Sequence, residues 1–377
     1  MNKKLLTLAI GASLAAPAMM AQADVKVYGA AQVEIARIKN DGPNAYPGTQ
    51  SSLNNNAVAA GDEKTATLDN KRGRFGISAD EDLGGGMKGL AKFEWNVDTA
   101  DNVDDSKNTN SLSPRDSWVG LKGVFGTIRL GRSGSPYKQT GVALDPFVTT
   151  SMEARNNFGM SGNSDGYGVL LAHNSFVSEG LHYTSPSMVG ITVDLYVGLD
   201  GTGANVAAGG QGQGAQTNGD LSAALSWKGG PVNVFVAYIK GNNVVKTAVL
   251  SPEPEALKIG GQFKFAKMHT IGFQYEMTDL DSVAADDTDE GEYLFLSYQL
   301  KLGNTTVVAQ GGLFENGGGG AAAANQEATY LNLGAIYNFS KTFRVFGGYR
   351  ATELEDETAA PTVRDDSVIT VGMRKDF

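Results

Sequence analysis

Residues that could support catalysis or bind a metal are few and scattered in this chain. The three histidines, His173, His182 and His269, fall in separate segments, and none has the partners at the spacing of a catalytic triad or a metal site. The chain contains no cysteine, which excludes a disulfide scaffold, a thiolate metal site and a cysteine nucleophile. We therefore expect no enzymatic activity, no catalytic residue, no metal and no cofactor.

Acidic and glycine-rich runs offer no better site. Residues 286–290 and 353–357 are acidic but lack the 12-residue spacing of a calcium-binding EF-hand loop. Residues 209–214 and 317–320 are rich in glycine but are not followed by the Lys-Ser/Thr pair of a phosphate-binding loop. The formal net charge of -10 also argues against nucleic acid as a partner, because phosphate binding requires a basic surface. These runs are typical of solvated loops.

The amino terminus predicts export. Lys3 and Lys4 precede an apolar run over residues 5–16, and Ala21-Gln22-Ala23 has the small-x-small pattern that a signal peptidase cleaves. The apolar run is shorter than the roughly 20 residues that a membrane-spanning helix needs. We expect residues 1–23 to be a signal peptide and residues 24–377 to be the mature domain.

The mature chain is dominated by alternation of apolar and polar residues, the period of a β-strand. In the first such segment, Val25, Val27 and Val33 alternate with Lys26 and Gln32 over about a dozen residues. We predict sixteen strands near residues 24–38, 72–81, 86–97, 115–122, 125–132, 181–185, 190–199, 220–228, 231–240, 256–265, 269–278, 292–301, 304–314, 328–338, 342–351 and 367–377.

The links between these strands alternate between short and long. Short links, such as residues 228–230 and 266–268, follow the even-numbered strands, and long links, such as residues 39–71 and 133–180, follow the odd-numbered ones. This pattern predicts an all-β fold, a 16-stranded antiparallel transmembrane β-barrel with short periplasmic turns and long outer loops. The apolar stripe would face lipid and the polar stripe a water-filled lumen. A soluble β-sandwich is the alternative, but it would not need strands of ten or more residues.

Three stretches carry a resemblance to a known family. EDLGGGMKGLAKFE at residues 81–94, SWVGLKGVFGTIRLGR at residues 117–132 and the terminal VGMRKDF resemble the Gram-negative general porins, in particular the group found in Neisseria and Burkholderia relatives. The resemblance implies a trimeric barrel whose third long loop folds inward to narrow the pore. It also implies that Phe377 is the signal recognised by the outer-membrane barrel assembly machinery. Lys375 departs from the family pattern, since that position is usually apolar or aromatic.

A charged constriction follows from this resemblance together with the alternation. Period two directs Arg72, Arg74 and Arg129 into the lumen. Arg132 would face lipid by strict alternation, but Gly131 before it can form a bulge that turns the arginine inward. The third long link carries Asp145, Glu153 and Asp165, which we expect to face this basic wall. Opposed charges would create a transverse field that selects solutes by charge.

The predicted function is a general diffusion porin, a passive channel for ions and small hydrophilic solutes in the outer membrane of a Gram-negative cell. The alternatives are a substrate-selective porin and a surface adhesin barrel. The expected partners are outer-membrane lipid and lipopolysaccharide, the assembly machinery, and two further copies of the chain in a homotrimer. The arginines favour anions, whereas the acidic outer loops favour cations, so the sequence leaves ion preference open.

Overall fold

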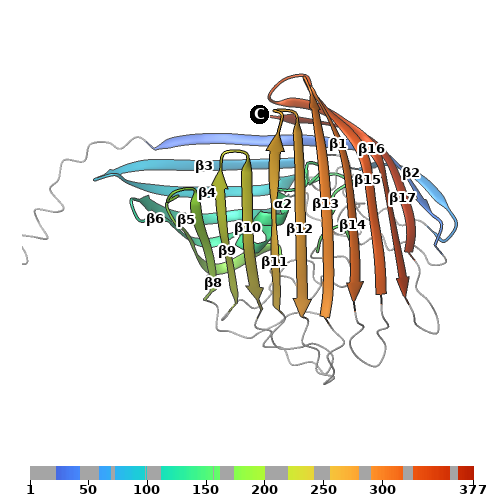
Figure 1. Cartoon of the computed structure of the whole chain (residues 1–377). Coiled ribbons are helices and arrows are strands. Elements are labelled where there is room, and N and C mark those ends of the chain that lie inside the picture. The colour runs from blue at the N-terminus through green and yellow to red at the C-terminus, as the bar shows by residue number, and fades with distance from the viewer. Residues whose placement is uncertain are drawn as a thin grey trace, which may run out of the picture.

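A computed structural model describes residues 23–42, 59–68, 73–97, 99, 112–155, 157–161, 174–199, 220–241, 255–279, 290–316, 326–356 and 364–377. These residues form seventeen strands and the short helix α2 (Pro136–Val142) (Figure 1). The strands are β1 (Asp24–Asn40), β2 (Glu63–Leu68), β3 (Gly73–Gly84), β4 (Met87–Val97), β5 (Leu112–Gly123), β6 (Gly126–Gly134), β7 (Phe176–Thr184), β8 (Ile191–Gly198), β9 (Leu221–Gly229), β10 (Val232–Lys240), β11 (Glu255–Phe265), β12 (His269–Asp279), β13 (Glu290–Leu302), β14 (Thr305–Asn316), β15 (Gln326–Asn338), β16 (Phe343–Asp356) and β17 (Arg364–Asp376).

The strands close into an antiparallel barrel. From β3 to β17 each strand pairs with its neighbours in the chain, and β1 pairs with β17 over Ala30–Asn40 and Asp366–Asp376. Strands β2 and β3 pair with successive parts of the same edge of β1 and together occupy one position, which gives a closed 16-stranded barrel. The sixteen predicted strands are confirmed. The prediction missed β2, which lies inside the expected link at residues 39–71.

The last residue completes the seam. The backbone N–H and carbonyl of Phe377 bond to the carbonyl and N–H of Gly29 at 3.0 Å each. A side chain at Gly29 would collide with the Phe377 ring, since a Cβ there would lie 2.4 Å from the ring. Lys375 keeps the predicted alternation at the turn end of the barrel, where its ammonium donates to Thr342 Oγ1 at 2.7 Å. The departure from the family pattern therefore does not disturb the register.

The outer face of the barrel is apolar. Alternate residues expose their side chains outward, among them Val27, Val119, Leu225, Ile369 and Val371. Aromatic residues gather near strand ends on this face, as in the stacked pair of Phe93 and Trp95 with ring centroids 6.2 Å apart. None of the helical structure in the described ranges is long and apolar enough to cross a membrane.

The compact core lies inside the barrel, where the link after β6 packs against the wall. Helix α2 lies behind the front strands in Figure 1 and contacts β8, β9 and β10. Beyond it, Leu144, Ala154 and Met160 pack against Phe235, Phe295 and Tyr330 of the wall. Several inward-facing residues from β9 to β16 are thus covered by this link, and we call its described residues, 135–155, 157–161 and 174–175, the inner loop. The inward-folded third loop that the family resemblance implied is therefore present, and it covers part of the polar stripe that alternation directs into the lumen.

Helix α2 begins where local sequence favours it. Ser135 is the N-cap residue, its hydroxyl accepts a hydrogen bond from the N–H of Lys138 at 3.2 Å, and Pro136 occupies the first helical position. The backbone N–H of Tyr137 donates to Ser222 Oγ on β9 at 3.0 Å. The helix therefore leaves β6 directly into the lumen.

Candidate functional site

Four neighbouring strands, β3 to β6, present cationic side chains to the lumen. Arg74 lies on β3, Lys92 on β4, Arg115 on β5 and Arg129 on β6. The register places Lys92 beside Trp118 and Arg129 beside Gly120 on the same inner face. We call this set, together with Arg132, the basic wall. Arg72, which the sequence assigns to the same face, lies outside the described residues.

A bulge between β4 and β5 adds a charge that alternation does not predict. The register shifts between Phe93 and Trp95, so two consecutive residues of β5, Arg115 and Asp116, lie opposite Glu94. Arg115 Nε donates to Glu94 Oε1 at 2.6 Å, while Asp116 accepts from Lys92 at 2.7 Å. Both side chains therefore face the lumen.

A second bulge redirects Arg132. Gly131 has a φ of 128°, in the region that favours glycine, and the pairing of β6 with β7 shifts between Gly131 and Ser133. A Cβ at Gly131 would lie 2.4 Å from the carbonyl oxygen of Ser117, so a larger residue would not fit. Arg132 Nη1 donates to Ser178 Oγ at 2.8 Å, and its guanidinium lies 5.7 Å from the Phe176 ring centroid.

Three cationic side chains lie close to the ring of Phe176. The Lys138 ammonium lies 3.9 Å from the ring centroid, and the guanidinium carbons of Arg115 and Arg132 lie 4.5 and 5.7 Å from it. Lys138 belongs to α2 inside the barrel, so the ring and all three cations face the lumen. Cation–π contacts offset part of the repulsion between these like charges. Sequence alternation missed Phe176, because the predicted strand began only at residue 181.

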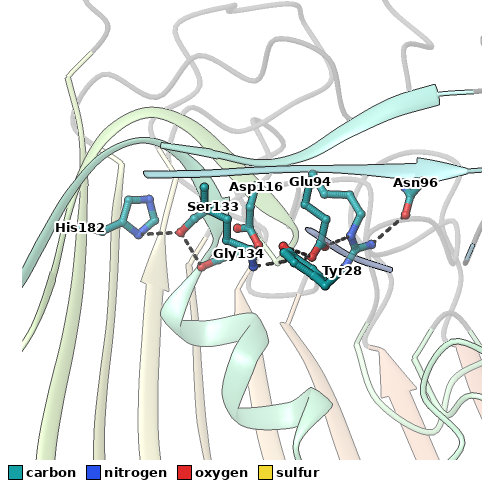
Figure 2. Close-up of polar contacts among 9 residues, drawn as sticks. Tyr28, Glu94, Asn96, Asp116, Ser133, Gly134 and His182 are labelled. Carbon is teal, nitrogen blue, oxygen red and sulfur yellow. Dashed lines mark hydrogen bonds and ion pairs between the residues drawn. The ribbon is translucent and has the colours of Figure 1, made fainter. Parts of the chain in front are cut away.

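The charges of the basic wall are unequally compensated. Glu94 accepts from Arg115 and from the hydroxyl of Tyr28 at 2.9 Å, and its carboxylate lies 3.6 Å from the ammonium of Lys92 (Figure 2). In contrast, Arg129 makes a 3.4 Å contact with Thr184 Oγ1. No described carboxylate lies within ion-pair distance of Arg129 or Arg132.

Two of the acids expected to face the basic wall lie elsewhere. Asp145 is buried, and its carboxylate accepts from the N–H groups of Phe147 and Ala154 and from Gln310 Nε2, each at 2.8 Å. Burial raises the pKa of Asp145 to about 6, and these hydrogen bonds act in the opposite direction. Glu153 is also buried and accepts from the N–H of Thr149 at 2.9 Å. Neither acid lines the lumen cavities.

The remaining predicted acid, Asp165, lies outside the described residues. The carboxylates that do accompany the arginines come from strands. Glu94 and Asp116 lie beside Lys92 and Arg115, and Asp194 on β8 accepts from Thr184, the contact of Arg129, at 2.6 Å. Arg115 would have been found only by predicting the bulge, because strict alternation places it on the outer face with Val119, whereas Asp116 shares the inward parity of Trp118.

The inner loop is fixed to the wall opposite the arginines. The N–H and hydroxyl of Ser151 both donate to Glu34 on β1, the hydroxyl at 2.7 Å. Tyr137 and Ser161 both donate to Glu276 on β12. The loop therefore narrows the lumen from the side of β1 and β9 to β16 and leaves the space in front of the basic wall open.

That open space comprises two adjoining cavities. The larger, about 520 Å³, is lined by residues near the turn ends of β3 to β6, including Lys88 and Lys122. The second, about 360 Å³, lies between the basic wall and the inner loop and is lined by Arg129, Gln139 and Asp194. Lys92 and Trp118 line both, so the two cavities adjoin at these side chains, and we call this place their junction.

A closed barrel with an apolar outer face, a charged lumen and a loop that narrows it defines a channel of the outer membrane. The chain belongs to the Gram-negative porin family, whose model matches residues 7–357. It therefore serves the passive diffusion of solutes across the outer membrane of a Gram-negative cell, and it is not an enzyme.

Known proteins resemble it in sequence and in structure. Outer membrane porin protein 32 of Delftia acidovorans is 26% identical over 360 residues, covering 92% of this chain and 88% of that protein. Major outer membrane protein P.IB of Neisseria meningitidis serogroup B is 33% identical over 143 residues, covering 37% and 36%. The anion-selective porin from Comamonas acidovorans superposes with a TM-score of 0.68 at 18% identity, covering 94% of this chain and 100% of that chain. OmpF of Salmonella typhi, solved with daunomycin, gives 0.67 at 16% identity, covering 94% and 97%.

Proposed function

We propose that this porin is a general diffusion channel that prefers small hydrophilic anions. The observation that carries the proposal is the unequal compensation of the basic wall. Arg129 and Arg132 have no carboxylate partner within ion-pair distance among the described residues, whereas Asp145 and Glu153 are buried and bonded to N–H groups of the inner loop itself. Charges at a narrow, partly desolvated passage influence ions more than charges at the mouth, which are screened over roughly 8 Å at physiological salt. We therefore expect the acidic residues of the outer loops to affect ion preference less than the arginines do.

The proposed roles of the predicted residues follow from this view. Arg74, Arg129 and Arg132 attract anions, and Arg72 belongs to the same wall by its alternation. Asp145 and Glu153 hold the inner loop in place. The neighbour from Comamonas acidovorans is described as anion-selective, which agrees with the proposal.

The test is the current through single channels in a planar bilayer. A general anion-preferring channel gives a large steady current in KCl. Under a KCl gradient, its reversal potential lies closer to the equilibrium potential of chloride than to that of potassium. An adhesin barrel would give no such current. A substrate-selective porin would instead give a small current that one solute blocks at low concentration.

We propose that three copies assemble into a homotrimer within lipid and lipopolysaccharide. A solved neighbour, OmpT of Vibrio cholerae, is described in a trimer form and superposes with a TM-score of 0.63 at 13% identity. Chemical cross-linking in outer-membrane vesicles should yield a limiting band of three chains. A ladder that ends at one chain would refute the trimer.

Export and assembly complete the proposal. Residues 1–23 act as a cleaved signal peptide, and Phe377 is recognised by the barrel assembly machinery. Deleting Phe377 should reduce the amount of assembled barrel in outer-membrane fractions, and Lys375→Ala serves as a control that keeps the terminal residue. Equal assembly of both variants would remove this role.

A further inference from the structure

The indole of Trp118 occupies an unexpected place for a channel of small ions. It lies on the inner face of β5, and it lines both lumen cavities where they meet. A large indole ring where the two cavities adjoin carries no charge of its own that would attract chloride. It does, however, offer a surface on which another flat apolar group can pack.

A cation with available donors lies beside this ring. The Arg129 guanidinium carbon is 5.6 Å from the centroid of the Trp118 ring. Its hydrogen bond within the described chain is the 3.4 Å contact from Nη2 to Thr184. A guanidinium over an aromatic ring keeps its in-plane N–H groups directed outward, and these can bind a carboxylate through two parallel hydrogen bonds.

The remaining walls of the 360 Å³ cavity combine apolar, neutral polar and acidic groups. Phe235 from β10 and Pro136 and Ala143 of the inner loop supply apolar surface. Asp116 is neutralised by Lys92 at 2.7 Å, and Asp194 is engaged by the Thr184 hydroxyl. An anion that enters therefore meets Arg129 with available donors, neutral polar side chains such as Gln139 and Asn233, and apolar surface on one side, while the Asp194 carboxylate keeps its charge. The volume is within the range of roughly 300 to 1,000 Å³ typical of small-molecule sites.

We propose that the junction of the two cavities is a binding subsite for aromatic monocarboxylates, with the carboxylate on Arg129 and the ring against Trp118. The subsite rests on the proposed anion preference and adds a preferred class of solute to it. Binding is weak, because a channel conducts only solutes that leave as readily as they enter. Benzoate is the simplest member of the class.

The experiment measures how benzoate and acetate reduce the chloride current through the full-length porin in a planar bilayer. Both anions carry one carboxylate, so their comparison isolates the ring. We expect benzoate to halve the current at a concentration about fivefold lower than acetate, the factor that one aromatic contact supplies. Benzyl alcohol, which has the ring without the charge, should leave the current unchanged at the same concentration.

Variants locate the effect. In Trp118→Leu the concentrations of benzoate and of acetate that halve the chloride current should lie within about twofold of each other, because the aromatic surface for stacking is gone. Trp227→Leu is the matched control, because Trp227 is exposed on the outer face, and it should keep the preference for benzoate. Because each channel is compared with itself, a changed basal conductance does not affect the result.

The outcomes separate the two proposals. Equal action of benzoate and acetate on the wild-type channel, or a benzoate preference that persists in Trp118→Leu, would overturn the subsite. A reversal potential close to the equilibrium potential of potassium, measured under a KCl gradient without benzoate, would instead overturn the anion preference on which the subsite rests.

Discussion

Replacing Arg129 with glutamine tests how strongly one arginine sets ion preference. Arg129 lines the cavity of about 360 Å³, which equals a sphere of about 4.4 Å radius, so we take an ion near its centre to lie roughly 6 Å from the guanidinium carbon. At that distance two unit charges interact by about 0.7 kcal/mol in water. The guanidinium attracts an anion and repels a cation. Its removal therefore changes the difference in free energy between the two ions at this point by about 1.4 kcal/mol, which corresponds to a tenfold change in the anion-to-cation permeability ratio.

Salt reduces this effect in a predictable way. The Debye length is about 10 Å at 0.1 M, so screening lowers the expected change to roughly fourfold. Glutamine keeps a side chain of similar reach, so the change reports charge more than pore width. The assay is the reversal potential under a KCl gradient, from which the chloride-to-potassium permeability ratio is obtained.

The matched control removes the same charge from the outside of the barrel. Arg37 lies on the outer face of β1 and pairs with Glu63, and its side chain is 58% exposed. Arg37→Gln should leave the permeability ratio unchanged, whereas Arg129→Gln should lower it about fourfold at 0.1 M. Equal changes in the two variants would mean that net charge, and not the charge at the narrow passage, sets the preference. An unchanged ratio in Arg129→Gln would refute the role of this arginine.

Three further predictions concern stability. Gly131→Ala should destabilise the barrel by roughly 1 to 3 kcal/mol in urea unfolding, because its backbone favours glycine, whereas Gly311→Ala, with its nearest neighbour atom 3.9 Å away, should be tolerated. Arg115→Met should cost about 1.5 to 3 kcal/mol, because Glu94 loses one charged hydrogen-bond partner and keeps Tyr28 and Lys92, and adding Glu94→Gln should restore most of the loss; a double variant no better than the single one would contradict this. The pKa of Asp145 is raised from its ordinary value of 3.8 to about 6 in the folded protein. The protonated Asp145 side chain therefore stabilises the folded state fully when the pH is below 3.8, and this stabilisation is lost as the pH rises through 6. The free energy of unfolding of the wild type should therefore fall by about 3 kcal/mol relative to Asp145→Asn between pH 3.5 and 7.5, and a constant difference would refute the assignment.

The strands could be predicted because their alternation is imposed by the membrane. Every lipid-facing position of a long strand must be apolar, as with Ile369 and Val371 on β17, so the pattern is visible without knowledge of contacts. The same periodicity correctly directs Arg74 and Arg129 inward. It cannot register a bulge, where one extra residue moves the following side chains to the other face. Arg115 was missed for this reason, whereas Arg132 could be placed because Gly131 marks the bulge.

The inner loop could not be predicted because it has no period. Its acids were expected to face the arginines, yet Asp145 is held by Gln310 on β14 and by the loop's own N–H groups. Nothing in the order of residues separates an acid that lines a pore from one that fixes a turn. The difference depends on which wall the loop packs against, and that is decided by apolar contacts such as those of Leu144 with Phe235 and Phe295.

The hydrogen bonds between Gly29 and Phe377 join the first strand to the final residue of the chain. The contact that closes the sheet is thus the last to be synthesised and the most distant in sequence. A truncated product keeps two open strand edges, which hydrocarbon does not tolerate because their amides stay unpaired. The barrel can therefore close only once β17 is available to pair with β1, so the sheet itself distinguishes chains that contain this strand from chains that lack it.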